Sequence, residues 1–199
     1  MTKVNWKIGV YGSNVNEGEV ASSLGTILGE TLAERGCLVI TGACSGMPYI
    51  VAHAAARHGA KVWGFTPELD EVGQKSTYPS DDMAIYDRLI YVPRTYRELF
   101  GVTSLSRERD HGARLKYRNV VSTVNCDAGM IISGSWGTLN EFTNLIYDGK
   151  PIGVLTGSGG LADELSDFYP RLRRRSNSSV LFESDPRRLV DRLLKVLEL

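Results

Sequence analysis

Short apolar runs alternate along the chain with longer segments of helical periodicity, and each run ends in a cluster of glycine, serine or threonine. The runs predict strands over residues 7–11, 37–41, 61–65, 89–92, 128–132, 152–155 and 180–182. The segments between and after them predict helices over residues 17–35, 47–58, 113–125, 136–147, 161–168 and 186–197. Strands separated by helices of this length pair in parallel through right-handed crossovers. The sequence therefore predicts an α/β fold with a doubly wound, mainly parallel, Rossmann-like sheet and helices on both faces.

Length and charge narrow the class of protein. With 199 residues, we expect one Rossmann-like nucleotide-binding domain spanning 1–199. Lys plus Arg and Asp plus Glu number 23 each, so no overall field would hold the chain on a polyanion, and nucleic acid is an unlikely partner. The three cysteines form no C-x-x-C pair, which disfavours a disulfide framework and a zinc ribbon.

The pattern of apolar and histidine residues indicates a cytoplasmic protein without a metal site. The first residues lack the apolar stretch of a signal peptide, and no run approaches the roughly 18 apolar residues of a membrane span. His53 and His58 are five residues apart on one predicted helix, about 140° around it, so they cannot share a metal ion. We expect no cofactor or metal, and no membrane partner.

Three glycine-rich loops follow predicted strands and precede predicted helices, at residues 12–14, 41–46 and 133–138. Backbone N–H groups and the helix dipole converge at such points, which is how a phosphate is held without a lysine. The alternative is that the glycines only make tight turns. Neither G-x-G-x-x-G nor G-x-x-x-x-G-K-[ST] occurs, which disfavours a hydride-transfer dinucleotide enzyme and a P-loop NTPase. The candidate phosphate- and nucleotide-binding residues are Gly12, Ser13, Gly42, Ser45, Gly46, Ser133, Gly134, Ser135, Trp136, Gly137 and Thr138.

Three further residues near these loops have two interpretations each. Glu141, in the first turns of its predicted helix, would meet positive charge on a substrate, or would close a capping box with Thr138. Arg118 lies on a cationic helix face that is either solvated or functional. Cys44 is either a thiol whose pKa is lowered by a helix N-terminus or a small residue that fills a turn.

The loop residues resemble a known family. The Gly12-Ser13 turn, the Arg118-Asn119 pair and the segment Ser133–Glu141 are similar to the LONELY GUY-type proteins, often labelled lysine decarboxylases, whose signature is P-G-G-x-G-T-x-x-E. The resemblance implies a homodimer that hydrolyses the N-glycosidic bond of nucleoside 5′-monophosphates, including cytokinin ribotides, to free base and ribose 5-phosphate. It also implies that Arg118 and Glu141 form the catalytic pair. Relatives that carry molybdenum cofactor share the fold and bind a phosphorylated pterin without turnover, so a carrier is the alternative.

The chain departs from the family pattern in its loops. Ser133 and Ser135 replace the proline and the second glycine of the signature, and Ala43 replaces a glycine of the second loop. We expect Ala43 and Ser135 to narrow the site or to need positive φ values. The long segments 67–87 and 94–111 carry aromatic side chains, which would close over a base or a pterin or cover a dimer seam. These aromatic residues are Tyr78, Tyr86, Tyr96 and Phe100.

Overall fold

The computed structural model describes residues 5–15, 17–102, 104–172 and 176–199. Seven strands form one sheet in the order β4-β3-β2-β1-β5-β6-β7, and every neighbouring pair is parallel. The strands are β1 (Lys7–Gly12), β2 (Leu38–Thr41), β3 (Val62–Phe65), β4 (Arg88–Ile90), β5 (Ala128–Ile132), β6 (Ile152–Leu155) and β7 (Val180–Glu183). The predicted doubly wound α/β fold is confirmed.

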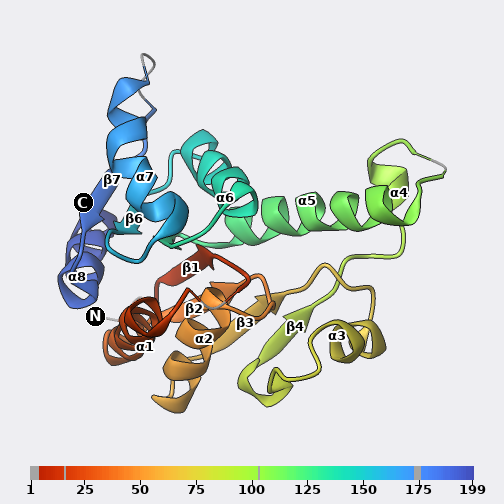
Figure 1. The fold of residues 1–199 in the computed structure, drawn as a ribbon, viewed down its shortest axis with the longest axis horizontal. Helices are drawn as coiled ribbons and strands as arrows, with labels where there is room; N and C mark the ends of the chain where they lie inside the picture. Colours follow the sequence, from red (N-terminus) through yellow and green to blue (C-terminus); the bar gives the residue numbers. More distant parts are fainter. Residues whose placement is uncertain (1–4, 16, 103, 173–175) are drawn as a thin grey trace.

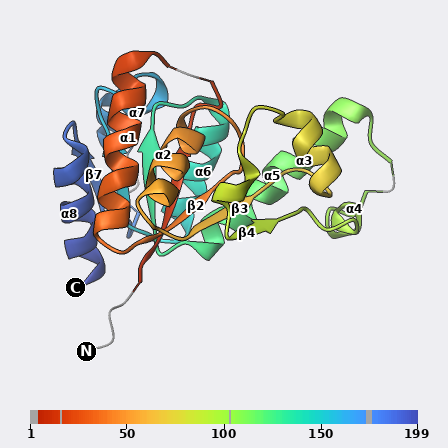
Figure 2. The ribbon, with the colours of Figure 1, turned by 90° about the horizontal axis from the view of Figure 1, so that it is seen from below.

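Helices cover both faces of the sheet (Figure 1). They are α1 (Glu19–Glu34), α2 (Met47–Arg57), α3 (Glu71–Thr77), α4 (Tyr96–Leu99), α5 (Arg107–Asn125), α6 (Trp136–Tyr147), α7 (Gly160–Phe168) and α8 (Pro186–Leu197), with single 3₁₀ turns at Met83–Ile85 and Tyr169–Arg171. Figure 2 looks onto the face that α1, α2 and α8 cover. None of the described helices has the length and apolar character needed to cross a bilayer.

Alternation along the strands divides the core in two. Ile8 and Val10 of β1 point to a cluster with α1, α2 and α8, whereas Tyr11 points to a cluster with α6 and α7. A parallel strand that is buried on both faces has a nearly continuous run of apolar residues, and for this reason the sequence predicts β1 and β5. The hydrophobic core therefore lies on both sides of β1 and β5.

Helix α5 is longer than the sequence predicts. It begins at Arg107, where Ser106 caps it by accepting a hydrogen bond from the N–H of Arg109, and not at residue 113. Residues 107–112 include no apolar side chain, so the helical periodicity is hidden there. The added turns carry α5 past the sheet toward α4 (Figure 1).

Ion pairs fix α5 to the long loop that follows β3. The Arg114 guanidinium donates to the carboxylate of Glu68 over 2.9 Å and to the carbonyl of Pro67 over 2.7 Å. At the start of the helix, Asp110 accepts hydrogen bonds from the Tyr96 hydroxyl and from Arg97. These contacts hold the inner face of α5 over the carboxyl ends of the strands.

The strand order reverses between β1 and β5, so the loops after these strands diverge there and leave room for a ligand. The two strand ends lie very close together. A Cβ atom on Gly12 would lie 2.2 Å from the carbonyl oxygen of Ile132, so only glycine fits at the end of β1.

Candidate functional site

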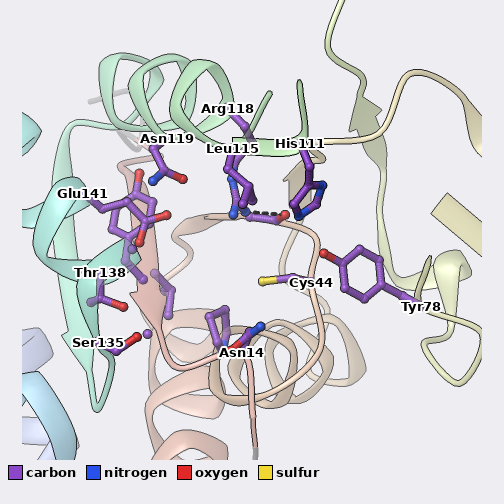
Figure 3. A pocket seen from close by; sticks show the side chains of 16 residues that line it. Asn14, Cys44, Tyr78, His111, Leu115, Arg118, Asn119, Ser135, Thr138 and Glu141 are labelled. Atoms are coloured by element: carbon purple, nitrogen blue, oxygen red, sulfur yellow. Dashed lines mark hydrogen bonds between the residues drawn. The ribbon is translucent and has the colours of Figure 1, made fainter. Parts of the chain in front are cut away.

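A cavity of about 240 Å³ lies at this edge of the sheet (Figure 3). Its walls are the end of β1, the loop after β2, the inner face of α5 and the first turns of α6, and Tyr78 stands at one end. Its lining residues include Gly12, Asn14, Gly42, Cys44, Tyr78, His111, Leu115, Arg118, Asn119, Ser135, Gly137, Thr138 and Glu141. Arg118, Glu141 and five of the eleven candidate loop residues are thus brought together.

The other candidate loop residues lie outside the cavity lining. The Ser45 hydroxyl donates to the carboxylate of Asp81 over 2.9 Å, and the carbonyl of Ser13 accepts a hydrogen bond from Met47. A Cβ on Gly46 would lie 2.3 Å from the backbone of Asn14, so this glycine allows the first two loops to pack together. Of the remaining three, Ser133 and Gly134 contribute to the loop backbone, and the Trp136 side chain points into solvent.

Contacts with α7 orient the loop between β5 and α6. The carbonyls of Ser133 and Gly134 accept hydrogen bonds from the N–H groups of Ala162 and Leu161, at 3.2 and 2.8 Å. In a trans peptide the N–H points opposite to the C=O, so the N–H groups of Gly134 and Ser135 point away from α7. The loop therefore presents its carbonyls to α7 and its amides to the other side.

The start of α6 has unused hydrogen-bond donors. The first backbone bond of the helix runs from the N–H of Leu139 to the carbonyl of Ser135, which leaves the first-turn amides free. Within the part of the chain that the structure describes, the backbone N–H groups of residues 134–138 donate to no other residue. We call these five amides the anion seat, because such donors and the positive end of a helix dipole favour a negative ligand.

Backbone angles in the loops test the expected strain. Ala43 has φ +47°, as predicted, and the hydrogen bond from Gln74 to its carbonyl holds it there. Ser135 lines the cavity with φ −144°, so of its two expected effects the positive φ is wrong, and Ser133 has φ +54°. Gly134 has φ +105°, and a Cβ on it would lie 2.5 Å from the Thr138 hydroxyl oxygen.

Arg118 is buried against the second loop. Its Nη1 donates to the carbonyl of Gly42 over 2.5 Å, and a Cβ on Gly42 would lie only 1.5 Å from that nitrogen. Burial alone would lower the pKa of Arg118, but the nearby Cys44 thiol and Glu141 carboxyl raise it above its ordinary value. The guanidinium stays charged, and the absence of a side chain at Gly42 is what gives it room.

Glu141 points into the cavity from the second turn of α6 (Figure 3). Only 6% of its surface is exposed, and none of the described residues donates a hydrogen bond to its carboxyl group. Burial raises the pKa of Glu141 to about 7, and the Arg118 guanidinium opposes part of that rise. The capping-box alternative is wrong, because Ser135 is the N-cap of α6 and Thr138 is already inside the helix.

The structure adds residues that sequence reasoning missed as site residues. Asn119 donates to Asn140 over 3.0 Å, while its own side-chain oxygen is buried without a partner among the described residues. His111 and Leu115 line the cavity because they share one face of α5 with Arg118, at spacings of four and three. That spacing was a signal, but it required the helix to begin before residue 113.

Cys44 and the aromatic residues of the long loops can now be placed. Burial raises the pKa of the Cys44 thiol, so of its two interpretations the lowered pKa is wrong. Tyr78 lines the cavity, and burial raises its pKa to about 12. Tyr86 packs on the core, Tyr96 is bound to Asp110, and Phe100 contacts Tyr117 in the middle of α5. Of these four aromatics, Tyr78 is the one at the cavity.

Comparison of the sequence with known families matches residues 5–96 to the SLOG cluster4 family. The matched segment contains β1 to β4 and ends before α5, so it includes the first two loops but neither Arg118 nor Glu141. No curated protein matches the sequence.

Several solved structures share the fold over nearly the whole chain. TM1055, a structural genomics target, superposes with a TM-score of 0.70 at 22% identity, covering 96% of this chain and 99% of that one. The molybdenum cofactor binding protein of Rippkaea orientalis has a TM-score of 0.66 at 19% identity and covers 98% and 99%. The molybdenum cofactor carrier protein of Chlamydomonas reinhardtii has a TM-score of 0.66 at 18% identity, with the same coverage. At these identities the likeness establishes a shared Rossmann-like α/β fold, and the sequence match adds that the first half of the chain resembles the SLOG cluster4 family.

Proposed function

We propose that the protein hydrolyses the N-glycosidic bond of nucleoside 5′-monophosphates and releases free base and ribose 5-phosphate. The observation that carries the proposal is Glu141, a buried carboxyl group without a hydrogen-bond donor among the described residues, in the same cavity as the anion seat. Burying such a group costs stability, and its negative charge opposes the binding of a phosphate in the same cavity. A carboxylate is useful there when positive charge develops on the ligand during a reaction.

The cavity suggests how the substrate would lie. Its volume of about 240 Å³ is below the roughly 300–1,000 Å³ of pockets that enclose a drug-sized ligand. It therefore suits a sugar phosphate, with the 5′-phosphate on the anion seat and the ribose beside Glu141 and Arg118. The base would extend toward Tyr78 and His111 at the opposite end, where the Tyr78 ring offers an aromatic face.

The reaction follows from these positions. The bond between C1′ and the base nitrogen breaks, the electron pair leaves with the base, and the ribose becomes an oxocarbenium-like cation. Ionised Glu141 stabilises that cation and orients the water that adds to C1′. The water oxygen bonds to C1′ and becomes its hydroxyl group, and the proton that it loses passes through solvent or the carboxyl group to the base nitrogen, so that one water is consumed for each bond broken. Arg118 steadies the phosphate or the leaving base.

The alternative is a carrier that binds a phosphorylated ligand, such as molybdenum cofactor, without turnover. Two observations favour it. Structures of molybdenum cofactor binding and carrier proteins cover 98% of this chain, and Ala43 and Ser135 place side chains where the resembled family has glycines. The anion seat would serve the phosphate of either ligand, so the two functions differ only in the role of Glu141.

Incubation with AMP and with cytokinin riboside monophosphates separates the two functions. The hydrolase releases free base in proportion to enzyme, measured by liquid chromatography, and Glu141→Gln abolishes the release while retaining the shape of the side chain. Glu164→Gln, at an exposed carboxylate of α7, is the matched control and keeps full activity. Saturable binding of the nucleotides with no base released by the wild-type protein would refute hydrolysis and favour the carrier.

We also propose a homodimer, because α5 buries polar residues and exposes apolar ones. Its buried residues, Arg118, Asn119, Ser122 and Thr123, are polar, whereas Val120 and Val124 are 48% and 59% exposed. Tyr147 of the adjacent α6 is 91% exposed. An exposed apolar face of this kind marks a protein interface. Val124→Glu should reduce the hydrodynamic mass to that of one chain, whereas Val72→Glu, at a still more exposed valine of α3, should not. A mass of one chain for the wild-type protein would refute the dimer.

A further inference from the structure

The Tyr78 hydroxyl group enters the cavity at the end opposite the anion seat. Tyr78 lines the cavity, and Figure 3 shows its hydroxyl oxygen pointing toward the interior. None of the described residues shares a hydrogen bond with this hydroxyl. The reaction proposed for the cavity uses the aromatic ring of Tyr78 and leaves its hydroxyl group without a role.

Tyr78 is placed by Gln74, the residue one helical turn before it. The buried side chain of Gln74 donates to the carbonyl of Ala43 over 2.8 Å and accepts a hydrogen bond from the Thr66 hydroxyl. The carbonyl of Gln74 in turn accepts a hydrogen bond of 2.9 Å from the N–H of Tyr78, at the end of α3. These bonds attach α3 to the loop after β2, which is a wall of the cavity, and they hold Tyr78 beside it.

The hydroxyl of Tyr78 is a hydrogen-bond donor at neutral pH. Burial raises its pKa to about 12, so the phenol keeps its proton. His111 lines the same end of the cavity, and its ring also has no hydrogen-bond partner among the described residues. An imidazole nitrogen, however, donates only in the matching tautomer or when the ring is protonated. Of these two side chains, Tyr78 is therefore the donor whose state does not change near neutral pH.

A donor at this end of the cavity matches the charge that forms on the leaving base. When the bond between C1′ and the base nitrogen breaks, the electron pair moves onto the base, and its ring nitrogens gain negative charge until a proton arrives. Glu141 stabilises the positive charge on the ribose, and its own negative charge does nothing for the base. A positioned hydrogen-bond donor stabilises a developing negative charge more than it stabilises the neutral ground state.

We propose that the Tyr78 hydroxyl group donates a hydrogen bond to a ring nitrogen of the leaving base and is thereby a catalytic residue of the hydrolysis. This inference rests on the proposed function for the position of the base. Tyr78 keeps its own proton throughout. The proton that neutralises the base still comes from the attacking water, so the balance of the reaction is unchanged.

Tyr78→Phe tests the hydrogen bond alone, because it removes the hydroxyl group and keeps the ring. With AMP as substrate, we expect kcat to fall about tenfold to a hundredfold, as for loss of a hydrogen bond to a charged group, and KM to change less than about threefold. Tyr86→Phe is the matched control, since it removes a buried hydroxyl group that does not line the cavity, and it should keep both constants.

A second substrate separates a catalytic hydrogen bond from a structural role of the hydroxyl group. Nicotinamide mononucleotide also carries a 5′-phosphate and an N-glycosidic bond, but its base leaves as a neutral molecule, because the electron pair cancels the positive charge of the pyridinium ring. No negative charge forms for Tyr78 to stabilise. Tyr78→Phe should therefore change kcat for this substrate less than about threefold.

The possible results distinguish this inference from the proposed function. A fall in kcat with AMP that is absent with nicotinamide mononucleotide supports it. Equal falls with both substrates, a rise in KM at unchanged kcat, or no change at all would each overturn it and leave hydrolysis intact. If the wild-type protein hydrolyses AMP alone, a fall in kcat at constant KM supports the hydrogen bond, and any other result overturns it. Release of no base from either substrate by the wild-type protein would refute the proposed function, and this inference with it.

Discussion

The Glu141 carboxyl group should destabilise the folded protein at neutral pH, and Glu141→Gln should reveal this as a pH-dependent gain in stability. Its pKa is about 7 in the folded protein, against an ordinary value of 4.5. The folded state therefore holds this proton more tightly than the unfolded chain. Its contribution is most favourable below pH 4.5, and it is lost as the pH rises through about 7.

The magnitude follows from the two pKa values. Because the two states bind this proton with different affinity, ionisation of Glu141 lowers the free energy of unfolding by about 3 kcal/mol at pH 8 and by about 1 kcal/mol at pH 5. The free energy of unfolding therefore differs by about 2 kcal/mol between the two pH values because of this group. A glutamine at position 141 also buries a polar amide, and this costs stability. The amide does not titrate, so its cost is the same at pH 5 and pH 8 and cancels when the effects of the substitution at the two pH values are subtracted. For a domain of this size, a difference of about 2 kcal/mol corresponds to about 4–8 °C in Tm.

Urea unfolding of the wild-type protein and of Glu141→Gln at pH 5 and pH 8 measures this difference. We expect the substitution to be about 2 kcal/mol more favourable at pH 8 than at pH 5, while base release from AMP is lost. Glu164→Gln controls for removing one negative charge and should show no such pH dependence. If Glu141→Gln changes stability equally at both pH values, the carboxylate is already stabilised in the fold, and the argument that it is held there for a reaction fails.

Three further predictions concern the reaction and the loops. The kcat/KM of hydrolysis should rise with pH through about 7, because only ionised Glu141 stabilises the ribosyl cation. If kcat/KM changes only near pH 6, the second pKa of a phosphate ester, the substrate phosphate sets the pH dependence and the role of Glu141 is refuted. Gly42→Ala should reduce base release about a hundredfold or more, because the added Cβ would displace the Arg118 guanidinium. Gly112→Ala, with no atom within 4 Å of its Cβ, serves as its control, and equal activity of the two variants would contradict the packing of Arg118. Gly134→Ala should lower Tm by several degrees because of its positive φ and its contact with Thr138, whereas Gly137→Ala should leave Tm unchanged and weaken AMP binding; the reverse order of Tm values would show that the loop backbone is placed incorrectly.

Much of the fold was predictable because local sequence and burial point to the same structure. Strands β1, β5 and β6 are buried on both faces, so each appears as a short apolar run, and the glycine that ends β1 appears as a turn. The loops after these strands had to lie at one edge of a parallel sheet. That rule placed Gly12, Gly42 and Thr138 at the same cavity before any side chain was positioned.

The start of α5 was not predictable from apolar periodicity. The fully buried residues of the helix are polar, whereas Val120 and Val124 are exposed, which is the reverse of the usual pattern. Its inward Arg114 is stabilised by Glu68, nearly fifty residues earlier in the chain. A pairing over that distance leaves no local signal, so His111 and Leu115 were missed as cavity residues.

The sequence by itself determined the α/β class, the parallel pairing of the strands and the three loops that end at the ligand edge, because these depend on short apolar runs, on helical periodicity and on glycine. Only the tertiary structure decided the state of individual groups. Glu141 has a raised pKa, Ser45 is bound to Asp81, and the amides of residues 134–138 are free because the loop carbonyls face α7. Burial and hydrogen bonding are properties of what surrounds a residue in space, and these surroundings come from segments far apart in the chain.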